Sequence, residues 1–134
     1  MADVIDAVRV AIMAKLKAEL PAASGIAGVG IYDHAPQNMA MPAVTLDRVI
    51  DEPDDLLDEE VSRVTVTLTL WSTARGPREA NHLRAGIRQT LHDATLALSE
   101  GESILCRYQR GDVTRDGDGV TYMGSVLIAA LIEH

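Results

Sequence analysis

The stretch VSRVTVTLTLWS, residues 61–72, alternates between apolar and polar side chains and is the clearest strand in the chain. Successive side chains of a β-strand point to opposite faces of the sheet, so the alternation defines two faces. One face carries Val64, Val66, Leu68 and Leu70. The other carries Arg63, Thr65, Thr67, Thr69 and Trp71. A chain that contains this strand must build a sheet with one apolar, buried face and a second face of different character.

Two amphipathic helices are expected, one before and one after this strand. Apolar residues recur every three or four positions between Asp3 and Leu20, and Pro21 is expected to end that helix. A second apolar stripe follows Pro77, which suits the first turn of a helix. It consists of Ala80, Leu83, Ile87, Leu91 and Ala94. The opposite side of that helix, with Asn81, Arg84, Arg88 and His92, is expected to face solvent.

Further strands are expected at residues 43–50, 103–114 and 120–132, the last two joined by the turn RDGDGV, whose Asp-Gly pairs favour a hairpin. The order of helix, strands, helix and hairpin predicts an α+β fold, with a mainly antiparallel sheet and two amphipathic helices packed on one face. A chain of 134 residues is expected to form a single domain, residues 1–134.

The last strand is apolar on both faces between Val126 and Ile132. Two interpretations remain open: a central strand capped by loops, or a strand whose second face is covered by a neighbouring subunit. Under the second interpretation the sheet face away from the helices is a subunit interface, because aromatic residues are enriched in interface cores. The candidate interface residues are Thr67, Thr69, Trp71, Leu127 and Leu131.

The stretch DEPDDLLDEE, residues 51–60, holds seven carboxylates: Asp51, Glu52, Asp54, Asp55, Asp58, Glu59 and Glu60. The whole chain has 20 acidic and 12 basic residues, a net charge of −8, so without this stretch 13 acidic residues face 12 basic ones and the remainder carries −1. The stretch is expected to be a loop between two strands, and one interpretation is that it is merely solubilising. The rest of the chain offers no basic surface that would indicate direct nucleic-acid binding.

No catalytic residue, cofactor site or metal site is expected, and the protein is not expected to be an enzyme. A calcium loop starting at Asp116 would need a glutamate where Leu127 stands. The four histidines lack metal-ligand spacing, and Cys106 is the only cysteine. The chain contains no membrane span and no signal-peptide pattern, so synthesis in a cytoplasm is expected.

In four stretches the chain resembles the tail-completion, or tail-terminator, proteins of long-tailed phages and phage-derived gene transfer agents. These are the amphipathic N-terminal helix, IYDHAPQNMAMPAVTL, a strand that ends in LWS followed by GPREANHLRAGIRQTL, and the closing DGDGVTYMGSVLIAAL. Together they span nearly the whole chain. The chain departs from the pattern near Ala43 and at Ile128, where the family would place aromatic residues, and these departures concern the subgroup.

The resemblance implies a structural role in virion assembly without chemistry. Such subunits form a six-membered ring that caps the last ring of the tail tube, stops tube polymerisation and joins the tail to the head-side connector, or stopper, protein. DNA passes through the ring without specific binding. The implied location is the host cytoplasm during assembly, and afterwards the virion or gene transfer agent particle, at the tail end that faces the head.

In such a ring the acidic stretch has two further interpretations: it lines the DNA channel, or it docks on a basic surface of a partner. Other functions also remain open. They are a connector or neck subunit of the same machinery, a small ligand-binding or regulatory domain of the host, and an enzyme with an unrecognised site.

Overall fold

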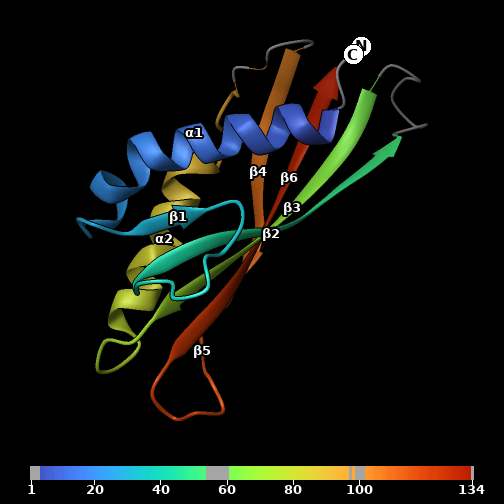
Figure 1. The fold of residues 1–134 in the computed structure, drawn as a ribbon. Coiled ribbons are helices and arrows are strands. Elements are labelled where there is room, and N and C mark those ends of the chain that lie inside the picture. Colours follow the sequence, from blue (N-terminus) through green and yellow to red (C-terminus); the bar gives the residue numbers. More distant parts are fainter. Residues whose placement is uncertain (1–3, 54–60, 97, 99–101, 134) are drawn as a thin grey trace.

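The computed structural model of the chain describes residues 4–53, 61–96, 98 and 102–133. Along the chain the elements are α1 (Val4–Ser24), β1 (Gly30–Tyr32), β2 (Ala43–Pro53), β3 (Val61–Ser72), α2 (Arg78–Leu91), β4 (Glu102–Gly111), β5 (Thr114–Arg115) and β6 (Tyr122–Glu133). Both helices lie on the same face of the sheet (Figure 1). The predicted α+β architecture is confirmed.

The strands form one six-stranded sheet in the order β1-β2-β3-β6-β4, with β5 paired to β6. All pairs are antiparallel except β1 with β2. The longest uninterrupted pairing joins β3 to β6, from Val61 opposite Glu133 to Ser72 opposite Tyr122. The strand with two apolar faces, β6, therefore lies inside the sheet, between β3 and β4.

The core lies between the helices and one face of this sheet, and it is aliphatic. The predicted apolar face of β3 is fully buried at Val64, Val66, Leu68 and Leu70, and β6 contributes Val126, Ile128, Ala130 and Ile132 from the neighbouring strand. The helices add Val8, Ile12, Leu16, Leu20, Ala80, Leu83, Ile87 and Leu91. The alternation in β3 and the stripes of both helices were therefore predicted correctly, except that α2 ends at Leu91 and Ala94, expected in its stripe, lies beyond that end.

Helix α1 continues through Pro21 to Ser24, so the prediction that Pro21 ends it was wrong. Proline removes one helical hydrogen bond, but the next turn is still stabilised, because Ser24 is buried and its Oγ donates to the Leu20 carbonyl oxygen at 2.8 Å. The helix ends at Gly25, whose φ of 73° is left-handed and whose N–H donates to the Pro21 carbonyl oxygen at 3.0 Å. Glycine is the residue that adopts this conformation without strain.

Strand β2 extends to Pro53, beyond the predicted end at Ile50. Asp51 pairs with Val64 and Glu52 with Arg63, so these two acidic residues belong to the strand and not to the predicted loop. The cross-strand position of Arg63 gives Glu52 a neighbour of opposite charge. The other five carboxylates of the acidic stretch lie outside the described residues.

The hairpin turn between β5 and β6 is closed by an aspartate and not arranged as a calcium loop. The Asp118 carboxylate accepts hydrogen bonds from the backbone N–H groups of Thr121 and Val120, both at 2.8 Å, and from the Thr121 hydroxyl at 2.7 Å. The bonds from Thr121, followed by that from Val120, lower the pKa of Asp118 because they favour its charged form. The Asp118 carboxylate is thus bound by groups within the turn.

The close crossing of the two helices predicts a stability loss for Gly86→Ala. A Cβ at Gly86 would lie 2.8 Å from the Cβ and 2.9 Å from the Cα of Ser24, so the helices would have to move apart. We expect the free energy of unfolding in urea to fall by about 1–3 kcal/mol. The control Gln89→Ala, at an exposed position of α2, should change it by less than about 0.5 kcal/mol. A Gly86→Ala protein as stable as the unchanged protein would contradict the close crossing.

The burial of Cys106 predicts that its thiol is protected from chemical modification. Its side chain is fully buried on the core side of β4, and burial raises its pKa from 9.0 to about 11. Because the thiolate is the reactive form, iodoacetamide should label the folded protein slowly at pH 8 and the urea-unfolded chain quickly. Between pH 9 and pH 11 the unfolded thiol loses its proton while the folded thiol keeps it. Stability should therefore fall as the pH rises, and Cys106→Ala should lack this contribution. Rapid labelling of the folded protein would contradict the burial.

Candidate functional site

The face of the sheet away from the helices is not covered by any element that the structure describes, and we call it the open face. Its residues come from four neighbouring strands, β2, β3, β6 and β4. The side chains that reach its surface are Arg48, Ile50, Glu52, Arg63, Thr65, Thr67, Trp71, Met123, Ser125, Leu127, Ala129, Leu131, Arg107 and Arg110. The four arginines and Glu52 are exposed, and the other nine side chains are half-buried.

The strand register arranges these residues in rows across the sheet. One row runs Arg48, Thr67, Leu127 and Arg110, and the next runs Ile50, Thr65, Ala129 and Arg107. Directly opposite residues share a face, so each row has an uncharged centre, and arginine stands at one or both of its ends. Three strand spacings separate the backbones of Arg48 and Arg110, about 14 Å.

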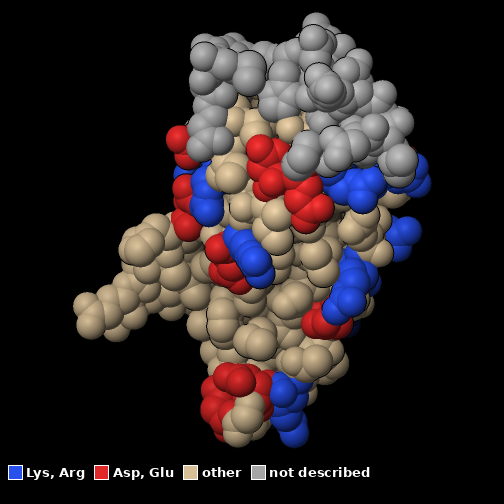
Figure 2. All heavy atoms as spheres, turned by 90° about the vertical axis from the view of Figure 1, so that its right-hand side faces the viewer, with Lys and Arg blue, Asp and Glu red and all other residues tan. Residues whose placement is uncertain are grey.

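Figure 2 views the molecule from the right-hand side of Figure 1. It shows basic side chains along the right-hand margin, and acidic side chains both beside them and nearer the middle of the view.

Register shifts turn the arginines toward the open face. The register shifts between Leu46 and Arg48 in β2, and in β4 it shifts twice, between Ser103 and Leu105 and between Tyr108 and Arg110. Without a bulge, residues two positions apart share a face, so Arg48 would lie on the core side with Leu46. The extra residue in each bulge reverses the alternation, as bulges commonly do where a side chain must be redirected. The sequence signal is a charged pair, Asp47 and Arg48, inside an otherwise alternating strand, and the prediction of a regular strand over residues 43–50 missed it.

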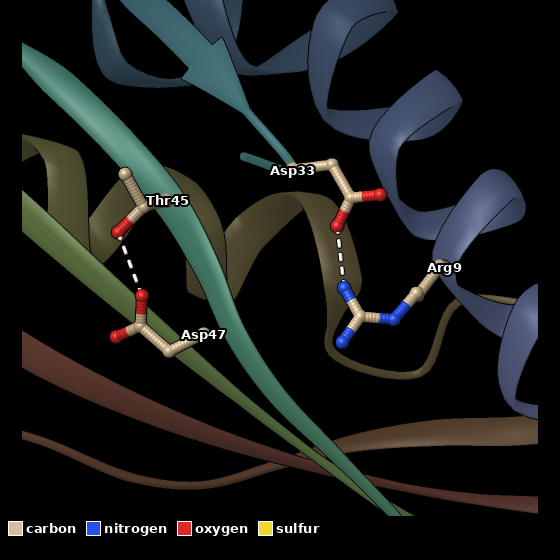
Figure 3. Close-up of polar contacts among 4 residues, drawn as sticks. All are labelled: Arg9, Asp33, Thr45 and Asp47. Carbon is tan, nitrogen blue, oxygen red and sulfur yellow. Dashed lines mark hydrogen bonds and ion pairs between the residues drawn. The ribbon is translucent and has the colours of Figure 1, made fainter. Parts of the chain in front are cut away.

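Trp71 lies at one end of the open face, beside a small polar network. The indole Nε1 donates to the Thr45 hydroxyl at 3.4 Å, and that hydroxyl donates to Asp47 Oδ1 at 3.0 Å. The Thr69 hydroxyl donates to the other carboxylate oxygen of Asp47. Figure 3 shows Thr45 and Asp47 facing each other from the same strand. The bulged Asp47 thereby links β2 to β3.

The structure places the five predicted interface residues as follows. Thr67, Trp71, Leu127 and Leu131 are half-buried on the open face, whereas Thr69 is only 7% exposed and is enclosed by its neighbours within the chain. Thr67 and Leu127 are direct cross-strand partners. The open face therefore brings four of the five together at its surface.

The outer edge of β4 is covered, because α2 and the chain that follows it pack there. Arg84 Nη1 donates to the Tyr108 hydroxyl at 3.1 Å, and the Arg88 guanidinium lies 5.1 Å from the centroid of the Tyr108 ring. His92 Nδ1 accepts the Tyr108 N–H at 3.1 Å. The expectation that this side of α2 only faces solvent was therefore wrong. Tyr108, which no sequence motif singles out, is the residue that gathers these contacts.

On the opposite side of the molecule an ion pair fixes α1 to the segment after β1. Arg9 Nη1 lies 2.5 Å from Asp33 Oδ1, as Figure 3 also shows. In the part of the chain that the structure describes, no three His, Cys, Asp or Glu side chains lie close enough together to hold a metal ion. No helix in that part is long and apolar enough to cross a bilayer.

The chain is an α+β subunit whose helices cover one face of a sheet and leave the other open. Residues 10–133 match the family model described as Tail completion protein gp17, so the chain belongs to this family of phage tail structural proteins. A chain of the solved structure titled "Virion of native gene transfer agent (GTA) particle" is similar, with a TM-score of 0.78 and 22% sequence identity. That match covers 99% of this chain and 100% of the other. At this identity the likeness shows the fold. No curated protein matches the sequence.

The polar network predicts that Asp47→Ala destabilises the subunit. Two threonine hydroxyls lose a shared acceptor in a nearly buried setting, which should lower the free energy of unfolding by about 1–3 kcal/mol. Asp51→Ala, at an exposed position of the same strand, is the matched control and should change it by less than about 0.5 kcal/mol. Equal stability of the two variants would show that the network does not hold β2 to β3.

Proposed function

We propose that this protein is the tail terminator of its particle. Six copies form a closed ring that caps the end of the tail tube and stops its polymerisation. The ring then joins the tail to the head-side connector or stopper protein. Membership of the tail completion family supports the assembly role, and the open face is the observation that carries the ring.

The open face has the character of a surface that another protein covers. Leu127, Ala129 and Leu131 form an apolar strip on β6, with Ile50 nearby on β2, and all four side chains remain half-buried. Each Å² of apolar surface that a partner removes from water contributes about 25 cal/mol. Both helices already pack on the other face, so within the described part of the chain no helix remains to cover this one.

A ring follows if the open face meets a different surface on the next copy. Contacts between unlike surfaces repeat head to tail, and they close into a ring when the rotation between copies allows it. A closed ring leaves no free lateral contact, so its growth stops, and its two sides can bind different partners. One side would bind the tail-tube protein and the other the head-side connector or stopper, with DNA passing through the centre.

The acidic residues Asp51, Glu52, Asp54, Asp55, Asp58, Glu59 and Glu60 have two possible places in this ring. Facing the channel, they would repel the DNA backbone and keep the passing DNA from sticking to the wall. Facing a partner, they would dock on a basic surface. The subunit would assemble in the host cytoplasm and remain in the particle, at the tail end that faces the head.

The test of the function is the phenotype of particles that lack the chain. A missing terminator should give tail tubes of uncontrolled and excessive length, because nothing stops polymerisation. A missing connector or neck subunit should instead give tails of normal length that fail to join heads. Normal-length unjoined tails would therefore contradict the proposed terminator role and support the connector role.

Trp71→Ala should weaken assembly while the isolated subunit remains folded. The indole is half-buried at the edge of the open face, so its removal should reduce self-association by about tenfold, equivalent to about 1.4 kcal/mol. Crosslinking between copies in purified tails measures the effect. Val10→Ala, which changes a 71% exposed side chain on α1, is the control and should assemble normally. Unfolding of Trp71→Ala would show that Trp71 belongs to the core, and normal crosslinking would exclude it from the interface.

A further inference from the structure

The open face and the acidic segment, residues 51–60, carry opposite charges. The segment holds seven carboxylates and no basic residue, and it accounts for most of the net charge of −8. The open face presents Arg48 on one margin and Arg107 and Arg110 on the other. The largest local excess of negative charge therefore has a counterpart of positive charge on the same subunit.

Arg48, Arg107 and Arg110 lack partners in the part of the chain that the structure describes, as do Arg75 and Arg78, which lie away from the open face. Arg9 pairs with Asp33, Arg84 and Arg88 contact Tyr108, and Arg115 lies over the Tyr122 ring. Within the residues that the structure describes, Arg48, Arg107 and Arg110 have no ion pair, hydrogen bond or ring contact. Three unpaired, exposed cations thus surround the apolar strip of β6.

Among the acidic residues that the structure describes on β2, Asp47 directly precedes Arg48, but its carboxylate is bound by the hydroxyls of Thr45 and Thr69. Asp51 and Glu52 lie further along the strand. Strand β2 runs from Arg48 toward Pro53, so Glu52 follows Arg48 by four residues, about 13 Å along the strand. Glu52 also stands opposite Arg63, which occupies the row nearest the end of the strand. The carboxylate of Glu52 therefore lies two rows away from the row that contains Arg48 and Arg110, with Arg63 opposite it.

The order of residues in the segment matches the order across the open face. Asp54 and Asp55 precede Leu56 and Leu57, and Asp58, Glu59 and Glu60 follow them. Carboxylates on both sides of a leucine pair correspond to arginines on both sides of the strip of Leu127 and Ala129. In an extended conformation residues 55–59 would span about 13 Å, close to the distance of about 14 Å between the Arg48 and Arg110 backbones.

We propose that the acidic segment of one copy binds the open face of the next copy. This inference rests on the proposed ring and names the two surfaces that meet in it. The carboxylates pair with Arg48, Arg107 and Arg110, and the two leucines lie on the apolar strip. Because the surfaces are unlike, each copy offers both halves of the contact, which is the head-to-tail arrangement that closes a ring.

The inference selects one of the two places considered for the segment. Carboxylates bound between copies do not line the DNA channel. Partly screened ion pairs weaken as ionic strength rises, so self-association should weaken with salt, whereas carboxylates on a channel wall would leave it unchanged.

The test reverses the charge of each surface in a separate variant and then combines the two variants. The face variant is Arg48→Glu/Arg107→Glu/Arg110→Glu, and the segment variant is Asp54→Lys/Asp55→Lys/Asp58→Lys/Glu59→Lys. Each is produced in cells that make the rest of the particle but lack this chain, and crosslinks between copies are measured in purified tail fractions. We expect each variant alone to lose crosslinks by about tenfold or more, because like charges then meet at every contact.

Produced together, the two variants should restore the crosslinks. The unchanged segment of the face variant meets the unchanged face of the segment variant, and the lysines of the other segment meet the new glutamates. The two variants must then alternate around the ring, which an even number of copies permits. The control Lys17→Glu/Arg75→Glu/Arg78→Glu makes the same change of charge at exposed positions away from the open face and should assemble normally.

The outcomes separate this inference from the proposed function. If the unchanged protein crosslinks to itself and both variants do so equally well, the ring stands and the docking is wrong. If both variants fail and their combination fails too, while the control assembles, the two surfaces do not meet and the inference is overturned. If even the unchanged protein never crosslinks to itself in tails, the proposed ring fails, and the inference fails with it.

Discussion

The pairing of β3 with β6 is the constraint on which the rest of the structure depends. Twelve consecutive residue pairs fix which side chains of the two central strands share a face. One face is thereby aliphatic and fully buried, with Leu68 and Ile128 among its largest side chains. The chain contains no phenylalanine, so aliphatic side chains must fill the core. Both helices contribute such side chains from the same side of the sheet, and this requirement places both helices there. The second face is left open because that requirement uses every helix in the described residues.

What the open face presents is decided by three register shifts, one in β2 and two in β4. A regular β2 would turn Arg48 toward the core, and without the shift between Tyr108 and Arg110 the side chains of Arg107 and Arg110 would lie on opposite faces. The shifts place Arg48, Arg107 and Arg110 on one face, so positive charge lies at the margins of an apolar strip. The same bulge in β2 makes Asp47 available to the hydroxyls of Thr45 and Thr69. A single inserted residue therefore both braces the sheet and helps to form the surface that we propose for assembly.

The sequence predicts the regular parts of this protein and not the contacts that depend on exceptions. Strict alternation gave residues 61–72 as a strand with its faces correctly assigned, and periodic apolar stripes gave both helices. The helix and strand ends were predicted wrongly where a tertiary contact offsets the unfavourable effect of a proline. Helix α1 continues through Pro21 because Ser24 is buried, and β2 reaches Pro53 because β3 pairs with it. The contacts of α2 with Tyr108 were also missed, because an amphipathic pattern shows which side of a helix is polar but not what packs beside that side. The bulges that place the arginines leave only a weak trace, a charged pair within an alternating strand.

The central claim, that the open face is buried between copies in the assembled tail, can be tested most directly by hydroxyl-radical footprinting read out by peptide mass spectrometry. Oxidation of Leu127, Leu131 and Trp71 should be compared between the free subunit and purified tails, with exposed Val10 and Val120 as internal references. We expect the three open-face side chains to become strongly protected on assembly while at least one reference keeps its reactivity. Equal oxidation of Leu127 and Leu131 in the free subunit and in tails would contradict the claim.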